Sequence, residues 1–166
     1  MYTHAEGLLS VAGKDTGETI AAHAEGRHTR AYGNYSHVEG YECQAEGEGS
    51  HAEGGYSRAN GNYSHAEGDA CKANAINSHA QNLGTKASSD NQTAIGRYNI
   101  EDTNNIYAFI IGNGNYTSPN YNYSNAFTIS WDGNIEMALD TSASSGTDYD
   151  LYAAMTALGW ESEVIV

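Results

Sequence analysis

The sequence is short of positive charge. Seven lysines and arginines stand against 21 aspartates and glutamates, which gives a formal net charge of −14. Residues 98–166 contain no lysine or arginine at all. An acidic surface of this kind repels nucleic-acid phosphates and anionic lipid headgroups. No apolar run has the length of a bilayer-spanning helix. We therefore expect neither a nucleic-acid partner nor membrane insertion.

Large apolar residues are scarce over the first 97 residues. They are scattered there, as at Leu8, Val11 and Ile95, and become frequent only after residue 98. A segment of this composition cannot bury a conventional hydrophobic core, and glycine, alanine and serine dominate it instead. The two cysteines are too few for a disulfide framework. No pattern in the chain indicates a cofactor.

What the first 97 residues do contain is a 14-residue repeat. Each unit has a histidine followed by alanine or valine, then glutamate or glutamine. "THAEG" at 3–7 is one more copy, separated by 19 residues because five extra residues fall within 14–22, and "TAIG" at 93–96 continues the series. A fixed period of this kind indicates a repeat architecture. The histidines at the 14-residue spacing are His23, His37, His51, His65 and His79.

Each unit also has a second half made of small residues. An alanine lies eight residues after each histidine, and a Thr, Cys or Ser lies two residues before that alanine. Two short strands per turn fit this pattern. Because side chains alternate along a strand, the Ser and Ala of "SHAEG" share one face and the His and Glu share the other. The small residues, with Cys43 and Cys71 among them, must face a narrow interior. The sequence therefore predicts an all-β solenoid over residues 1–97.

The repeat resembles the head repeats of trimeric autotransporter adhesins of the YadA type, also called Hep/Hag repeats, whose unit reads "SVAIGxxSxAxG". Residues 3–96 follow that pattern, and "TAIG" matches it most directly. The resemblance implies a left-handed parallel β-roll, assembly as a homotrimer and a function in attachment. The repeats and the "SNAFTISWDGNI" segment that follows them also look like those of tail-fibre and baseplate proteins of bacteriophages and prophages.

Histidine and glutamate stand where the adhesin family usually has valine and isoleucine, at positions that face the other two chains. The resemblance thus implies that these columns line the trimer interface. Stacked glutamates would repel one another, and adjacent histidines relieve that repulsion by charge and hydrogen bonding. Glutamate neighbours are then expected to raise the histidine pKa, which would make trimer stability depend on pH. The candidate interface residues are His23, Glu25, His37, Glu39, His51, Glu53, His65, Glu67, His79 and Ile95.

Two other uses of the histidine and glutamate columns stay open. Imidazole and carboxylate groups bind divalent metals, but no turn differs from the others in a way that marks a metal site. Glycoside hydrolysis needs two carboxylates ~5–9 Å apart, and the glutamate column supplies such pairs at every step. Their spacing therefore identifies no particular pair. We predict no catalytic residue, no metal site and no enzymatic activity.

The chain after the repeats divides into two parts. Residues 98–140 are predicted to form a β-structured head region, with a strand at 106–112 and a hairpin in "AFTISWDGNIEMAL". Residues 141–166 are predicted to be a linker, one short helix and a C-terminal tail. The fold class is thus all-β apart from that helix.

The loop of the predicted hairpin can be placed from the apolar pattern. A three-residue loop at 132–134 pairs Trp131 with Ile135 and brings every large apolar side chain of the hairpin to one face. A two-residue loop would put them on opposite faces. We therefore predict the three-residue loop, with Asn134 in the left-handed conformation.

The segment "NGNYTSPNYNYSN" at 113–125 is predicted to be a long loop between two strands, and long loops are often functional. Tyrosine offers a flat apolar ring with a polar tip, and asparagine offers a paired donor and acceptor. That chemistry suits sugars and protein epitopes alike. An equal alternative is that the tyrosines pack across the trimer. The candidate receptor-binding residues are Asn115, Tyr116, Asn120, Tyr121, Asn122 and Tyr123.

These patterns favour a structural and attachment module of a phage or prophage tail fibre, located on the virion or at a cell surface. Its partners would be two further copies of the chain and a bacterial surface saccharide or protein. The alternatives are the head of a bacterial surface trimeric adhesin and a polysaccharide depolymerase. An anchoring stretch in the parent gene would favour the first alternative, and turnover of a capsular glycan would favour the second.

Overall fold

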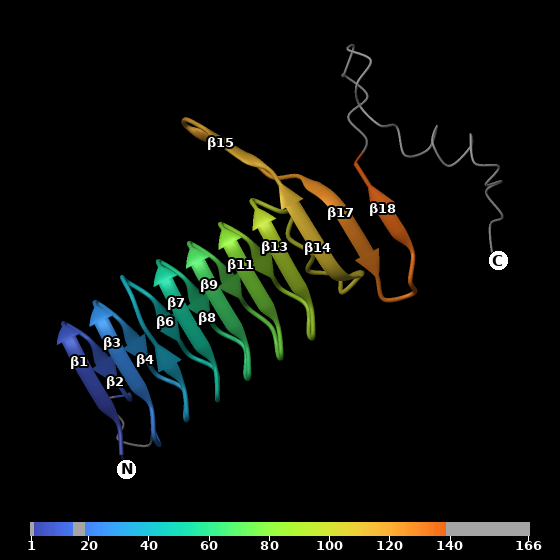
Figure 1. Ribbon diagram of the computed structural model, residues 1–166. Helices are drawn as coiled ribbons and strands as arrows, with labels where there is room; N and C mark the ends of the chain where they lie inside the picture. The colour runs from blue at the N-terminus through green and yellow to red at the C-terminus, as the bar shows by residue number, and fades with distance from the viewer. Residues whose placement is uncertain (1, 15–18, 139–166) are drawn as a thin grey trace, which may run out of the picture.

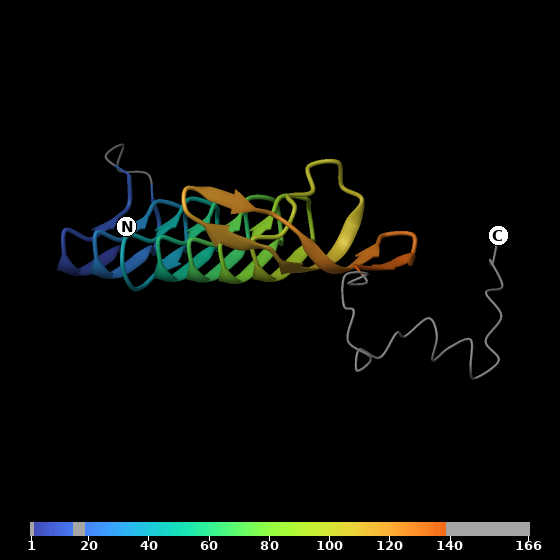
Figure 2. The same ribbon diagram turned by 90° about the horizontal axis from the view of Figure 1, so that it is seen from above.

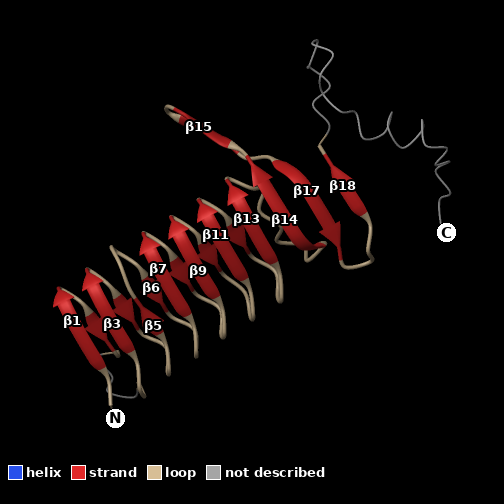
Figure 3. Ribbon diagram, in the orientation of Figure 1, coloured by secondary structure: helices blue, strands red, loops and turns tan. Residues whose placement is uncertain are grey.

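The computed structural model describes residues 2–14 and 19–138, and these form strands and turns with no helix among them. Figure 3 shows strands throughout this part of the chain. No helix long and apolar enough to cross a membrane is found within the described ranges. The helix expected within 141–166 lies outside the described residues.

A β-solenoid of about six turns with 14-residue spacing runs from β1 to β13, as the sequence predicts (Figure 1). The first strand of each turn begins at the repeat histidine or its equivalent, and these strands pair in parallel with histidine opposite histidine. The first strands are β1 (His4–Leu8), β3 (His23–Arg27), β5 (His37–Val38), β7 (His51–Gly55), β9 (His65–Asp69), β11 (His79–Leu83) and β13 (Thr93–Arg97).

The second strand of each turn builds a separate six-stranded parallel sheet. Its strands are β2 (Val11–Ala12), β4 (Arg30–Ala31), β6 (Gln44–Ala45), β8 (Arg58–Ala59), β10 (Lys72–Ala73) and β12 (Lys86–Ala87). Figure 2 shows the two sheets as the two sides of a thin column. The predicted division of each unit into two short strands is therefore confirmed.

Small side chains fill the space between the two sheets. The alanines of both strands, from Ala24 to Ala94, are fully buried, and Val38 takes one of their places. Four of the histidines follow a buried serine, whose hydroxyl donates a 2.7 Å hydrogen bond to the carbonyl of the preceding corner, as Ser36 does to Gly33. These turns thus satisfy their buried serine hydroxyls, and no large apolar residue is needed.

The two cysteines lie in this interior, as expected. Cys43 and Cys71 are fully buried free thiols in the inward Thr/Ser position. The hydroxyl of Thr85, one turn later in the same column, donates to Cys71 Sγ at 3.2 Å. Burial raises the pKa of both thiols. Both groups are therefore held in the unreactive thiol form.

Glycine is required where successive turns approach each other closely. A Cβ atom at Gly40 would lie 2.2 Å from the carbonyl oxygen of Gly54, and Gly40 has a positive φ of 105°. A Cβ atom at Gly47 would lie 1.9 Å from the carbonyl oxygen of Gly61. The glycine columns of the sequence therefore follow from the narrow separation of the turns.

Side chains close the solenoid after β13. Asn99 lies where the next strand of the six-stranded sheet would begin, and its amide bonds both Lys86 N (2.8 Å) and Lys86 O (3.0 Å). Gln92 replaces the buried serine and donates to the carboxylate of Asp102 at 3.0 Å. Asp102 also accepts from the backbone nitrogens of the loop that follows it, including Tyr107 N at 2.8 Å. These contacts redirect the chain out of the repeat.

The first strands of the turns belong to a ten-stranded sheet that continues beyond the solenoid. β14 (Tyr107–Asn113) pairs in parallel with β13 and confirms the strand predicted at 106–112. β17 (Asn125–Ser130) and β18 (Ile135–Met137) then add antiparallel strands. The segment between β14 and β17 forms a two-stranded hairpin of β15 (Asn115–Thr117) and β16 (Asn120–Asn122).

The β17–β18 hairpin differs from the prediction in its register. Its loop has three residues, but Ile129 pairs with Ile135, so the loop is 131–133 and not 132–134. The left-handed residue is Gly133 (φ 83°) and not Asn134. Glycine adopts that conformation without a Cβ clash, so it takes the position in preference to asparagine. The indole of Trp131 is held away from the strand by donating to Asn105 Oδ1 at 3.0 Å.

Candidate functional site

The β15–β16 hairpin, here called the tyrosine arm together with Tyr123 directly after it, carries the predicted receptor-binding residues. The structure places a hairpin where the sequence predicted a loop, with Tyr116 opposite Tyr121 and Asn115 opposite Asn122. Every residue of both strands is exposed. In Figure 1 the arm projects from the end of β14, away from the row of solenoid strands. The sequence identified the residues, and the structure brings them together on one projecting element.

The tyrosine rings of the arm contact one another. Tyr116 and Tyr121 lie 4.7 Å apart between ring centroids, and Tyr121 and Tyr123 lie 6.2 Å apart with nearly parallel planes. Each ring nevertheless stays about half exposed. On the polar side, Asn122 Nδ2 donates to Asn115 Oδ1 at 3.0 Å. The arm therefore presents aromatic faces and amide groups together, which is a suitable surface for sugar rings or peptide groups.

Sequence reasoning missed the residues that hold the arm against the solenoid. The ring of Tyr98, at a solenoid corner, lies 5.4 Å from that of Tyr121, and partial burial followed by this neighbour raises the pKa of Tyr98. The ammonium of Lys86 lies 5.2 Å from the ring centroid of Tyr123. Tyr56 occupies the corner position equivalent to Tyr98, so no sequence signal singles Tyr98 out.

The second candidate surface is the outward face of the first strands of the turns, here called the histidine–glutamate face. These strands are β1, β3, β5, β7, β9 and β11. The predicted interface histidines form one stack on it. The centroid distances are 4.9 Å for His23–His37, 4.7 Å for His37–His51 and 4.8 Å for His51–His65, with interplanar angles of 10° or less. His79 turns edge-on to His65 at 5.0 Å. The columns predicted from the 14-residue spacing are therefore continuous in space.

Only some histidines of this stack form a hydrogen bond with a glutamate. Within the described part of the chain, the Nε2 atoms of His23, His37 and His51 are buried and have no hydrogen-bond partner. The His23 ring lies near Glu25, but Nε2 and Oε2 are 3.9 Å apart, which is too long for a hydrogen bond. A single chain therefore leaves three imidazole nitrogens unsatisfied on rings that are only partly buried.

The pKa shifts in the stack differ from the expectation. The sequence predicted that glutamate neighbours raise the histidine pKa. Instead, burial and then the adjacent His65 and His37 rings lower the pKa of His51, and these effects outweigh Glu53 and Glu39. Burial and then His65 likewise lower the pKa of His79. The main reason is that burial disfavours the charged imidazolium, and a neighbouring imidazole further disfavours a second positive charge.

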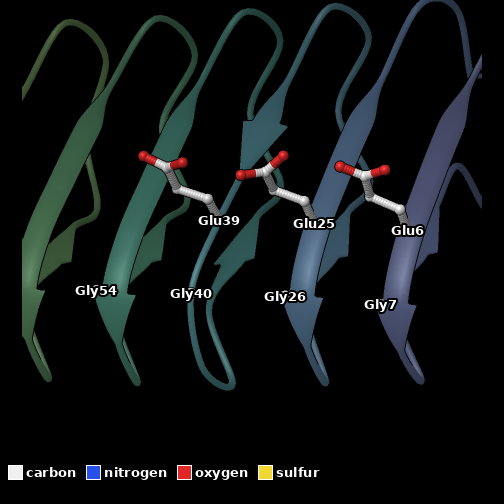
Figure 4. Close-up of a pocket in the computed structure, with 7 residues that line it drawn as sticks. All are labelled: Glu6, Gly7, Glu25, Gly26, Glu39, Gly40 and Gly54. Carbon is white, nitrogen blue, oxygen red and sulfur yellow. The ribbon is translucent and has the colours of Figure 1, made fainter.

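The glutamates at the N-terminal end form a plain row. Glu6, Glu25 and Glu39 line a shallow open hollow together with the glycines that follow them, and Figure 4 shows their carboxylates projecting side by side from successive strands. Each step of the row repeats the last. Among these three glutamates the geometry singles out no pair.

The same face becomes apolar toward β18. Thr93 and Ile95 continue the histidine and glutamate columns, and β14 places Phe109 opposite Thr93 and Ile111 opposite Ile95. β17 and β18 extend this surface, here called the apolar patch, and Ile135 is 60% exposed. The residues of the patch are Ile95, Phe109, Ile111, Phe127, Ile129, Ile135 and Met137.

Comparison with known proteins gives no relative for this chain. No protein-family model, no curated protein and no solved structure matches it. The resemblance to trimeric adhesin heads therefore rests on the repeat pattern of the sequence.

Proposed function

We propose that this chain is a homotrimeric structural and attachment module of a phage or prophage tail fibre, and that its tyrosine arm binds a bacterial surface saccharide or protein. The observation that carries the proposal is the gathering of Tyr116, Tyr121 and Tyr123 on and directly after one exposed hairpin. Exposed aromatic rings flanked by amide groups are the usual means of protein recognition for sugars and peptides. No chemical step is part of the proposed function.

The trimer is supported by the composition of one sheet face. The histidine–glutamate face leaves buried imidazole nitrogens without partners, and the apolar patch continues it without interruption. A large contiguous apolar surface on a small protein favours a protein partner. Two further copies of the chain, arranged as the resemblance to left-handed β-rolls implies, would cover both surfaces at once. Each chain would then keep its arm on the outside of the trimer.

The proposal is tested by native mass measurement followed by a binding screen. We expect a mass three times that of the chain, and retention on a bacterial glycan array or on intact cells. Tyr121→Ala is expected to remove most of that binding. Tyr35→Ala is the matched control, because Tyr35 is 58% exposed against 55% for Tyr121 but lies at a solenoid corner away from the arm.

Each outcome of the screen has a clear meaning. Equal binding by the two variants would exclude the arm as the receptor site. Binding that disappears when the cells are treated with protease, but not when their glycans are oxidised, would assign a protein receptor. Release of soluble saccharide from the array would overturn the proposal in favour of a depolymerase.

A further inference from the structure

One pair of turns in the histidine–glutamate face differs from its neighbours. Glu53 belongs to β7, but its carboxylate reaches the next turn, where Oε1 lies 3.1 Å from His65 Nε2. The rings of His51 and His65 are parallel and 4.8 Å apart. One ligand atom from each of these three residues lies within 4.8 Å of the other two. The sequence repeat does not distinguish these turns, so the difference arises from side-chain conformation.

One nitrogen of this cluster lacks a partner, and the other two side chains are partly exposed. Among the described residues, His51 Nε2 has no hydrogen-bond partner and is closed off from solvent. A buried polar atom without a partner carries a free-energy cost that a bound ligand would remove. The side chains of His65 and Glu53 are 32% and 31% exposed in the single chain, so an ion can reach the cluster before the proposed trimer covers this face.

The backbone beneath the cluster is well defined. β7 and β9 pair over five residues, with His51 opposite His65 and Glu53 opposite Glu67. Ligand atoms around a tetrahedral ion lie ~3.3 Å apart, given metal–nitrogen distances of ~2.0–2.1 Å. The three ligand atoms already lie within 4.8 Å of one another, so the longest separation has to shorten by no more than about 1.5 Å to reach that spacing.

We propose that His51, Glu53 and His65 form a three-ligand site for a divalent transition metal, with zinc as the best-fitting ion and water in the fourth position. Two imidazoles and one carboxylate suit zinc, whereas calcium and magnesium prefer oxygen ligands alone. All three ligands come from one chain, so the site does not depend on the proposed trimer.

A second set with the same chemistry lies at the N-terminal end of the face. It comprises His4, Glu6 and His23. The side chains of His4 and Glu6 are 65% and 59% exposed, so this set is less constrained and is expected to bind more weakly. Measurements in a His4→Gln background therefore isolate the central site.

The test is calorimetric titration of the chelator-stripped chain with zinc chloride, with cobalt(II) absorption as a report on coordination. We expect one zinc per chain at micromolar concentration in the His4→Gln background. His65→Gln and Glu53→Gln should each weaken binding by about tenfold or more. His37→Gln is the matched control, since it makes the same change in the same column outside both sets.

Circular dichroism of each variant shows whether the solenoid is intact, and these half-exposed positions are expected to tolerate glutamine. Failure of the intact chain to bind zinc at micromolar concentration would overturn the proposal. A loss of affinity in His37→Gln equal to that in His65→Gln would also overturn it, because binding would then be spread along the whole column. Preference for calcium over zinc would have the same consequence.

Discussion

At the scale of single residues, close backbone approach controls this fold. The glycines that follow the glutamates, and those at the following corner, lie where a Cβ would overlap the next turn, as at Gly47. Gly55 lies in the same solenoid but has room for a Cβ atom, which would meet only an oxygen of Asp69, at 3.7 Å. Both residues are glycines of the repeat region, and only their surroundings differ.

Gly47→Ala and Gly55→Ala should therefore have opposite consequences. Gly47→Ala forces apart two turns and is expected to lower the free energy of unfolding by about 1–3 kcal/mol or more. Gly55→Ala should leave it unchanged or raise it by up to ~1 kcal/mol, because alanine restricts the unfolded chain. Urea denaturation followed by circular dichroism measures both. Equal destabilisation would show that the turns are not packed as described.

Asn99 and Asp102 illustrate what a repeat pattern leaves out. Asn99 bonds the backbone groups of Lys86 that a further turn would otherwise bond, and Asp102 accepts from backbone nitrogens of the segment that follows it. Both residues lie just after the last repeat. A search for periodicity finds the repeat and is blind to the residues that end it. Their role follows only from the hydrogen bonds.

Lys86 and Glu101 form an ion pair at the same end of the solenoid, with a 2.8 Å Nζ–Oε2 distance. Burial opposes ionisation of Glu101, but the bonds from Lys86 and Ser88 outweigh it and lower its pKa. The ion pair therefore stabilises the folded state above pH 4.5, the ordinary pKa of glutamate. That stabilisation is lost as the pH falls through the lowered pKa of Glu101 in the folded state.

Glu101→Gln is expected to reduce the loss of folding stability that the native chain shows as the pH falls. Because both side chains are partly exposed, the effect at neutral pH should be only about 0.5 kcal/mol. Thermal melting from about pH 7 to about pH 3 measures it, with Asp132→Asn in the exposed hairpin loop as the control. An unchanged pH profile for Glu101→Gln would show that the pair contributes nothing measurable.

At the scale of elements, the tyrosine arm depends on the solenoid. A two-stranded hairpin alone is marginally stable in water. Contacts from Tyr98 and Lys86 hold the arm, and a Cβ at Gly114 would meet both Asn122 O and Tyr98 O at 2.3 Å. The arm thus has a fixed position only because the last turn offers it a docking surface.

Tyr98→Ala should loosen the arm without unfolding the column. Amide hydrogens of residues 115–122 are expected to exchange about tenfold faster, since loss of an aromatic pair costs about 1 kcal/mol or more. Exchange in β7 and β9 should stay the same. Tyr56→Ala, at the equivalent corner, is the control. Unchanged exchange in the arm of Tyr98→Ala would mean that its position is set by other contacts.

At the scale of the whole molecule, one sheet face changes from polar to apolar along its length. The apolar patch is expected to be the most tightly packed part of the proposed trimer. Ile135→Lys would place an unpaired ammonium group in that interface, at a cost of several kcal/mol. We expect the variant to run at the mass of one chain in native mass spectrometry. Thr103→Lys, on an exposed loop, should leave the mass unchanged.

The monomer should tolerate Ile135→Lys, because β18 is an edge strand with exposed side chains. A folded variant that keeps three times the chain mass would place the subunit interface elsewhere. A native chain with the mass of one copy would remove the trimer from the proposed function and leave the arm to be tested by itself.

The sequence by itself determined the solenoid, the two strands of each turn, the inward alanines and the continuous histidine and glutamate columns. Short-range sterics and a strict period leave a chain of tiny side chains few other ways to bury itself. Only the tertiary structure decided the register of the β17–β18 hairpin, the docking of the arm and the reach of Glu53 to His65. Those depend on contacts between residues that no local pattern relates, and on which side chain fills the space that its neighbours leave.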